Sequence, residues 1–197
     1  PLKNTAIRSW VDVLFRAQES FLQFKSKSVY HKDFIRFIKH PFIQAYISKE
    51  DVRDLQKIES TILSKNWLFI HLKSLELREE LKAFIQLCFQ PWGNDYNAVV
   101  CAIRLINNKL YEAIQGDEYT LEKSLLFHFD ASLMKLENIL AEFQPAIHIK
   151  TFKTLFNQHW MNESIAYYGN PLDGLQVMGL LETRLLDFKN LIVVGLN

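Results

Sequence analysis

The chain has 197 residues, of which 49% are hydrophobic and 23% are charged, and its formal net charge is +1. This length and composition are those of a globular chain with a substantial core, and the near-neutral charge excludes a strong overall attraction to nucleic acid or membrane. No apolar run approaches the roughly 20 residues of a membrane span. A binding surface on this chain must therefore be a local patch, and we expect no membrane partner.

The periodicity of apolar residues predicts a series of about seven helices up to residue 162. Pro41 is expected to end or kink the second helix, and Ser48 with Asp51 resembles a capping box at the start of the third. The most apolar helix is expected to be central and to stop at Gly116. The expected helices lie at about residues 5–25, 30–40, 48–65, 74–89, 95–116, 119–143 and 149–162.

The pattern changes after Asn162. Residues 175–178 and 191–196 are strand-like, and the second run is apolar on successive residues, which indicates a strand covered on both faces. We therefore expect a mainly α fold in which residues 1–162 form a helical subdomain and residues 163–197 form a short parallel α/β segment. The other strands of that sheet are expected elsewhere in a longer parent chain.

Two further features bear on cellular context. Cys88 and Cys101 both lie in apolar stretches, so we expect buried free thiols, as in a reducing cytoplasm. No signal peptide opens the chain, which agrees with a cytoplasmic location. The first residue is a proline rather than a methionine, and we expect a segment excised from a longer gene product.

The last 23 residues, LQVMGLLETRLLDFKNLIVVGLN, resemble the stretch around motif V of UvrD/Rep-type superfamily I helicases. They are more similar to its degenerate version in AddB-like and Bacteroidetes-type inactivated helicases that carry a PD-(D/E)XK nuclease domain. In those proteins the loop tends to read Leu-Glu-x-Arg-x-Leu-Asp-Phe, as residues 181–188 do here. The opening PLKNT looks like the tail of the preceding motif, and YHKDFIRFIKHPFI resembles part of the helical insert.

This resemblance implies that residues 1–162 are the helical insert of a second RecA-like domain and that residues 163–197 return into the RecA-like layer. It implies a non-catalytic module of a DNA-repair helicase–nuclease that shapes a path for DNA, expected to be single-stranded, or couples it to a degenerate helicase core. One alternative is a protein-interaction scaffold that contacts a partner helicase–nuclease subunit. Another is an unrelated helical domain with an accidental C-terminal likeness.

The resemblance also singles out residues in the C-terminal loop. Arg184 lies where active relatives place a lysine, and its guanidinium suits a phosphate. Asp187 lies at the acidic position that reaches a nucleotide ribose, and Glu182 and Thr183 complete the degenerate nucleotide site. The alternative is that Glu182, Arg184 and Asp187 form local ion pairs and caps.

Other positions of the loop argue against nucleotide binding. Gly179, Leu181 and Leu185 stand where active relatives have threonine, histidine and glycine. A leucine in place of the glycine should obstruct close approach of a ligand to the backbone. We therefore expect no cofactor in this segment, while ATP binding by the parent protein stays open.

The second candidate site is electropositive. Lys32, Arg36, Lys39 and His40 are expected on one face of the second helix, preceded in sequence by Lys25 and Lys27. Such a stripe can follow a phosphate backbone, with affinity that falls steeply with salt. The alternative is an ordinary solvated helix face.

Aromatic residues and histidines complete the candidates. Tyr30 and Phe37 either stack on bases or pack in the core. The six histidines are scattered without metal-ligand spacing, and His128 is expected in the core or at its boundary. The sequence therefore predicts no catalytic residue and no metal site.

Overall fold

The computed structural model describes residues 5–24, 28–93, 95–116, 119–143, 149–161, 177–179, 187 and 189–194. The chain divides into two units, Pro1–Ile165 and Ala166–Asn197. Eight α-helices are described in the first unit: α1 (Ala6–Phe24), α2 (His31–Ile38), α3 (Pro41–Tyr46), α4 (Lys49–Ser64), α5 (Glu79–Cys88), α6 (Tyr96–Ala113), α7 (Thr120–Phe143) and α8 (Ile149–Met161). The mainly α fold predicted from the sequence is confirmed, with one helix more than expected among these residues.

The additional helix is α3, and it exists because Pro41 does two things. Proline ends α2 before it, and its fixed φ suits the first position of a new helix. The ring of His40 accepts a hydrogen bond from the backbone N–H of Phe42 and so caps α3. The capping box predicted at α4 is confirmed, because Ser48 and Asp51 bond reciprocally to each other's backbone N–H groups.

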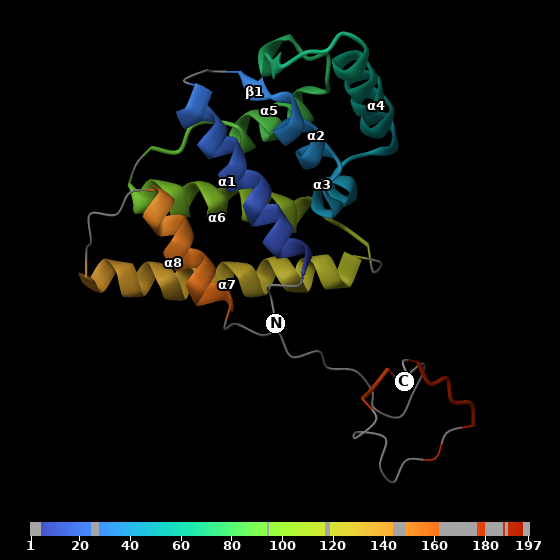
Figure 1. The fold of residues 1–197 in the computed structure, drawn as a ribbon, viewed down its shortest axis with the longest axis vertical. Coiled ribbons are helices and arrows are strands. Elements are labelled where there is room, and N and C mark those ends of the chain that lie inside the picture. The colour runs from blue at the N-terminus through green and yellow to red at the C-terminus, as the bar shows by residue number, and fades with distance from the viewer. Residues whose placement is uncertain are drawn as a thin grey trace. The chain divides into compact units, whose positions relative to one another are not determined.

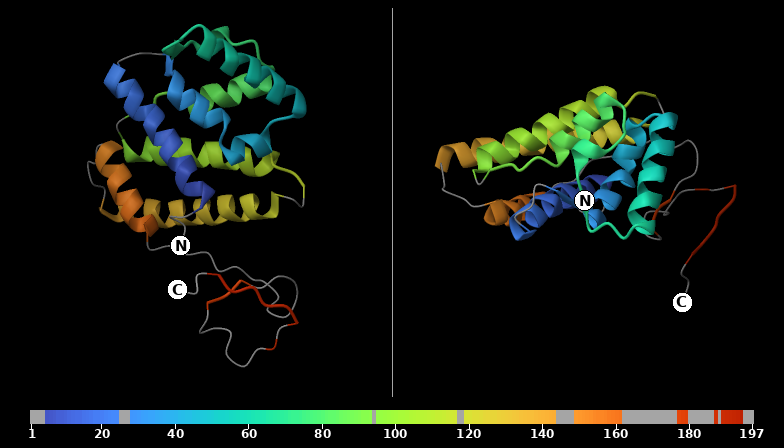
Figure 2. Two further views of the ribbon diagram at one scale, coloured as in Figure 1. Left: turned by 45° about the vertical axis from the view of Figure 1, so that its right-hand side comes forward. Right: turned by 90° about the horizontal axis from the view of Figure 1, so that it is seen from above.

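The helices of the first unit are arranged in two layers (Figures 1 and 2). Helices α6 and α7 lie side by side in one layer, and α1 and α8 cross them in the other. Helix α1 contacts α2, α3, α7 and the short strand β1 (Val29–Tyr30), while α8 contacts both α6 and α7. The expectation of a central apolar helix is met by α6, which ends at Ala113 shortly before Gly116 (φ 110°).

The core between these layers is rich in aromatic rings. On α1, the Trp10 ring lies 5.6 Å from that of Phe37 and the Phe15 ring lies 5.7 Å from that of Trp92. Phe15 also contacts the rings of Phe152 and Phe156 on α8, at 6.3 and 6.2 Å. Helix α1 therefore contributes rings that contact aromatic side chains of both α2 and α8.

The strands differ from the expectation. A two-stranded antiparallel ribbon pairs β1 (Val29–Tyr30) with β2 (Phe69–Ile70), and η2 (Leu72–Ser74), a 3₁₀ turn, follows β2. In the second unit, the described residues of the two expected parallel strands, 177–178 and 191–194, are assigned to no strand. The remaining residues of that segment lie outside the described part of the chain.

Two burial predictions are wrong. Cys88 is a buried free thiol as predicted, but Cys101 is exposed. It lies on the outer side of α6, because its neighbours Val99, Val100 and Ile103 face the core. His128, expected in the core or at its boundary, is exposed because Phe129 takes the inward position of α7. Among the described residues, no helix is both long and apolar enough to cross a membrane.

Replacing Phe15 tests the aromatic core. Phe15→Ala should lower the free energy of unfolding by about 3–5 kcal/mol, because a large buried ring leaves a cavity among three aromatic neighbours. Phe127→Ala is the matched control, since the Phe127 ring is 61% exposed and its loss should cost below about 1 kcal/mol. Urea denaturation followed by circular dichroism measures both, and equal losses would contradict this account of the core.

Candidate nucleic-acid interface

Helix α2 has an inner apolar face and an outer basic face. Phe34, Phe37 and Ile38 are buried, whereas Lys32, Arg36 and Lys39 are exposed. Phe37 is fully buried, so it belongs to the core and not to a base-stacking surface.

The three exposed cations of α2 are not equivalent. The ammonium of Lys39 lies 2.5 Å from the carboxylate of Glu59 on α4, so much of its charge is compensated. In the described part of the chain, no ion pair is recorded for Lys32 or Arg36. These two side chains are the ones best placed to meet an external anion.

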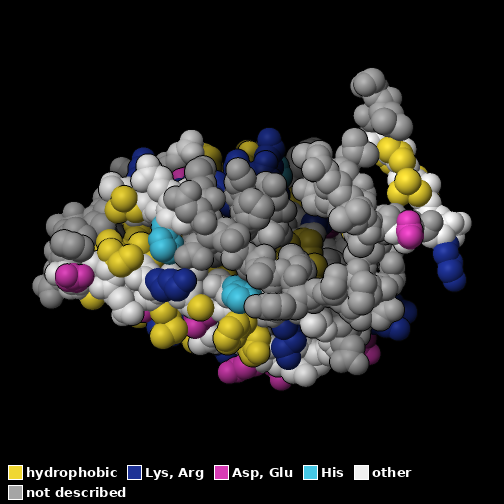
Figure 3. All heavy atoms as spheres, turned by 90° about the horizontal axis from the view of Figure 1, so that it is seen from below, with side chains coloured by type: hydrophobic (Ala, Val, Ile, Leu, Met, Phe, Trp, Pro, Cys, Tyr) yellow, Lys and Arg dark blue, Asp and Glu magenta, His cyan; other side chains and the backbone are white. Residues whose placement is uncertain are grey.

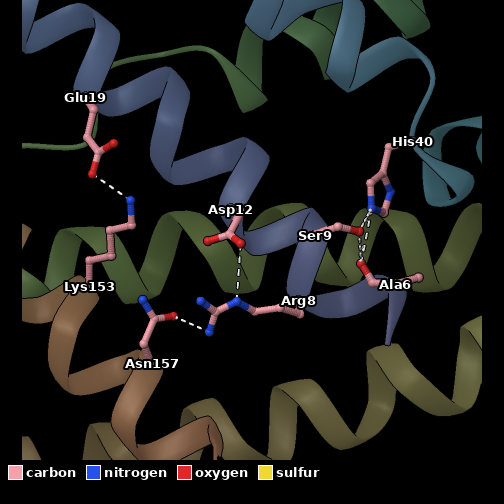
Figure 4. Close-up of polar contacts among 8 residues, drawn as sticks. All are labelled: Ala6, Arg8, Ser9, Asp12, Glu19, His40, Lys153 and Asn157. Carbon is pink, nitrogen blue, oxygen red and sulfur yellow. Dashed lines mark hydrogen bonds and ion pairs between the residues drawn. The ribbon is translucent and has the colours of Figure 1, made fainter. Parts of the chain in front are cut away.

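The placement of His40 on the basic face is wrong. His40 is only 5% exposed and its ring faces α1 (Figure 4). The N–H of Phe42 donates to Nδ1 over 3.2 Å, so the ring proton must sit on Nε2, which faces the Ser9 hydroxyl and the Ala6 carbonyl at 2.9 and 3.1 Å. Burial lowers the pKa of His40 from 6.5 to about 4, against a smaller opposing effect of the Ala6 carbonyl. The ring is a neutral structural group.

The β1–β2 ribbon brings a distant segment beside the start of α2. Val29 pairs with Ile70 and Tyr30 pairs with Phe69, and the N–H of His31 donates to the carbonyl of Leu68 over 3.0 Å. Because Lys32 follows His31 and Trp67 precedes Leu68, this bond brings the loop that holds Trp67 close to the start of α2. Residues separated by 35 positions in the sequence therefore share one surface.

Aromatic side chains gather at this ribbon. The ring of Phe24, at the end of α1, lies 5.5 Å from Tyr30 and 5.1 Å from Phe69, and Tyr30 lies 6.0 Å from Phe69. Tyr30 therefore packs within this cluster and is half-buried, which leaves its predicted stacking role open. We refer to the surface formed by Phe24, Tyr30, Lys32, Arg36, Lys65 and Trp67 as the ribbon face.

Trp67 has a fixed backbone and an exposed ring. Asn66 adopts the left-handed conformation (φ 50°) just after α4, and the N–H of Trp67 donates to the carbonyl of Ile62 over 3.0 Å. This is the bond pattern of a Schellman motif, with asparagine in the position that glycine usually takes. The Trp67 side chain is 38% exposed, and the ammonium of Lys65 lies 5.6 Å from the centroid of its ring.

The segments that form the ribbon are rich in lysine. Residues 22–32 and 63–75 together contain five lysines and no aspartate or glutamate. The next residue, Asp33, is buried and accepts a hydrogen bond from the Ser20 hydroxyl over 2.5 Å. Two of the five lysines, Lys25 and Lys27, lie outside the described residues.

The C-terminal loop cannot be assembled into a site from the described residues. Arg184, Glu182 and Thr183 lie outside them, and Asp187 is described only as exposed. Their predicted roles therefore stay predictions. Among the described residues, no group of three or more His, Cys, Asp or Glu side chains could hold a metal ion.

Comparison with protein-family models, with curated proteins and with solved structures finds no match to this chain.

Sequence reasoning found half of the ribbon face and missed the other half. Lys32 and Arg36 follow from the charge pattern of one helix. Lys65 and Trp67 were missed because they lie in the turn between α4 and β2, and β2 has only two residues, too few for an alternating pattern. Asn66, between the end of a long helix and an aromatic residue, could have indicated this turn, because asparagine often ends a helix in the left-handed conformation.

The buried His40 predicts a specific pH dependence. Between pH 6.5 and pH 4 the unfolded chain binds a proton at this ring that the folded chain does not, so stability present above pH 6.5 is lost as the pH falls toward 4. The depressed pKa corresponds to about 3 kcal/mol of unfolding free energy. His40→Asn keeps an acceptor for the N–H of Phe42. Between pH 7 and pH 4, its unfolding free energy should fall by about 3 kcal/mol less than that of the wild type.

Urea unfolding of both proteins from pH 7 to pH 4 measures the difference, because all other titrating groups are shared. Parallel stability profiles would show that His40 takes up its proton equally in the folded and unfolded chains, which would contradict a lowered pKa.

Proposed function

We propose that this chain is a non-catalytic, DNA-binding helical module of a helicase–nuclease-like protein and that single-stranded DNA runs over its ribbon face. The observation that carries the proposal is the surface that bears the exposed side chains of Lys32 and Arg36 on α2 and of Lys65 at the end of α4. Asp33, the acidic residue between the first two, is buried. The net charge of the chain is only +1, so attraction to a polyanion has to come from such a local concentration.

Phosphate binding by this face would be driven by release of counterions from the strand. Lys32 and Arg36 are exposed and project from a helix that is anchored by its buried phenylalanines. A rigid support reduces the ordering cost of each contact, because only the side chains need to be immobilised. Lys39 is expected to contribute less, since binding a phosphate would compete with Glu59.

The likeness of residues 175–197 to motif V supports placing this module beside a degenerate RecA-like core. In that arrangement Arg184 contacts a phosphate, and Glu182, Thr183 and Asp187 are remnants of a nucleotide site rather than an ATP site. The proposal includes a cytoplasmic location.

A protein-interaction scaffold is the second candidate, and α6 and α7 favour it. Leu105 on α6 is 48% exposed, and Phe127 and Met134 on α7 are 61% and 45% exposed. On the α7 side of the fold, hydrophobic side chains lie at the surface in several groups (Figure 3). Exposed apolar side chains of this size are common at contacts with a partner subunit.

Two substitutions on α2 test the proposed function. Lys32→Ala and Arg36→Ala should each weaken binding of a 12-mer oligothymidylate and each lower the slope of log K against log salt by about 0.7, the value for one phosphate contact to a single strand. Fluorescence anisotropy at several salt concentrations between 50 and 200 mM measures both quantities. The loss should be uniform across DNA sequences, because phosphate contacts carry no base information.

Lys57→Ala is the matched control, because Lys57 on α4 is exposed but already pairs with Asp54 at 3.0 Å. It should leave affinity and slope unchanged. If the wild-type protein fails to bind the oligonucleotide at 50 mM salt, or if Lys57→Ala has the same effect as Lys32→Ala, the proposed DNA path is wrong and the scaffold function is favoured.

A further inference from the structure

We infer that Trp67 is a stacking platform for an unpaired base, so that the ribbon face recognises the bases of a single strand as well as its phosphates. This inference rests on the proposed function, because it assigns a role to a residue of the same surface. It goes further in that it predicts discrimination between single-stranded and duplex DNA.

The first argument is that the Trp67 ring is presented on a rigid support. Its N–H bonds to the carbonyl of Ile62 in the motif that ends α4, and two residues later β2 pairs with β1. The backbone on both sides of Trp67 is thus held by hydrogen bonds. A large ring on a fixed backbone loses little conformational freedom when a base stacks on it.

The second argument is exposure. Trp10 and Trp92 are 0% and 4% exposed and belong to the core, whereas Trp67 is 38% exposed. Trp67 is therefore the tryptophan among these three that solvent and a ligand can reach. Aromatic faces at the surface of a basic groove are the usual platforms for bases of single strands.

The third argument is the chemistry around the ring. Lys65 places its ammonium 5.6 Å from the indole centroid, and Lys32 follows His31, whose N–H donates to the carbonyl of Leu68, the residue after Trp67. A base stacked on the indole therefore has cations near its own phosphates. An acidic peptide would satisfy those cations too, but it would leave the aromatic face unused.

This arrangement predicts what the site selects. Bases in a duplex are already stacked on one another, so only an unpaired base can reach the indole without paying to leave its helix. Stacking is tolerant of sequence, because every base has a flat aromatic face. The site should therefore prefer single strands while discriminating weakly among them.

The test compares two probes of equal phosphate number, a 12-mer oligothymidylate and a 12-mer of abasic deoxyribose phosphates. Trp67→Ala should weaken binding of the oligothymidylate about tenfold and leave binding of the abasic strand unchanged within twofold. Oligothymidylate should quench the fluorescence of the wild-type protein, and the part of the quenching due to Trp67 should vanish in Trp67→Phe.

Leu63→Ala is the matched control, because Leu63 is a 58% exposed apolar residue on α4 near the same surface. It should leave both affinities unchanged. Circular dichroism melting of each variant separates loss of binding from loss of fold, and Trp67→Phe, which keeps an aromatic ring, should retain most of the affinity if Trp67→Ala unfolds.

Three results would overturn the inference. Equal binding of the oligothymidylate and the abasic strand by the wild type would show that the face reads phosphates alone, and the proposed DNA path would survive. Binding of a 12-residue polyglutamate as tight as that of the oligothymidylate would assign the face to an acidic protein. No binding of oligothymidylate at 50 mM salt would overturn both the inference and the proposed function.

Discussion

Burial of the aromatic side chains of α1 is the constraint on which the rest of the first unit depends. Trp10 meets the rings of α2 and α3 at one end of the helix, and Phe15 meets Trp92 and the rings of α8 at the other. Polar contacts at the edge of this core connect α1 to α8 (Figure 4). Arg8 donates to Asn157 over 2.8 Å, and Lys153 donates to Glu19 over 2.6 Å. The apolar contacts supply most of the stabilisation, because ion pairs this exposed contribute little.

The positions of the residues in the candidate interface depend on the packing of that core. Packing of α2 on α1 fixes the start of α2, and β1 immediately before it holds β2 in register. The end of α4 is fixed in turn by its left-handed Asn66, and the loop that holds Trp67 then leads directly into β2. A cationic and aromatic surface thus results from hydrogen bonds and buried rings.

The features that could be predicted from the sequence are those that depend on residues close together in the chain. Helix positions and the capping box of Ser48 and Asp51 are local, and the sequence indicated them. The solvent exposure of Cys101 depends on which side of α6 meets α7, which local apolar composition cannot tell. His40 was misplaced because a histidine following basic residues looks like part of their stripe, whereas here it caps α3. The β1–β2 pairing joins residues far apart in sequence, and only the folded chain reveals it.

The central claim is that nucleic acid occupies the ribbon face rather than the α6–α7 surface. Hydrogen exchange of the backbone amides, followed with and without the 12-mer oligothymidylate, distinguishes these surfaces in one experiment. The account predicts slower exchange confined to residues 28–36 and 63–70, with α6 and α7 unchanged. Slower exchange along α6 and α7 with none at the ribbon would contradict it and would place the binding surface on the opposite part of the fold.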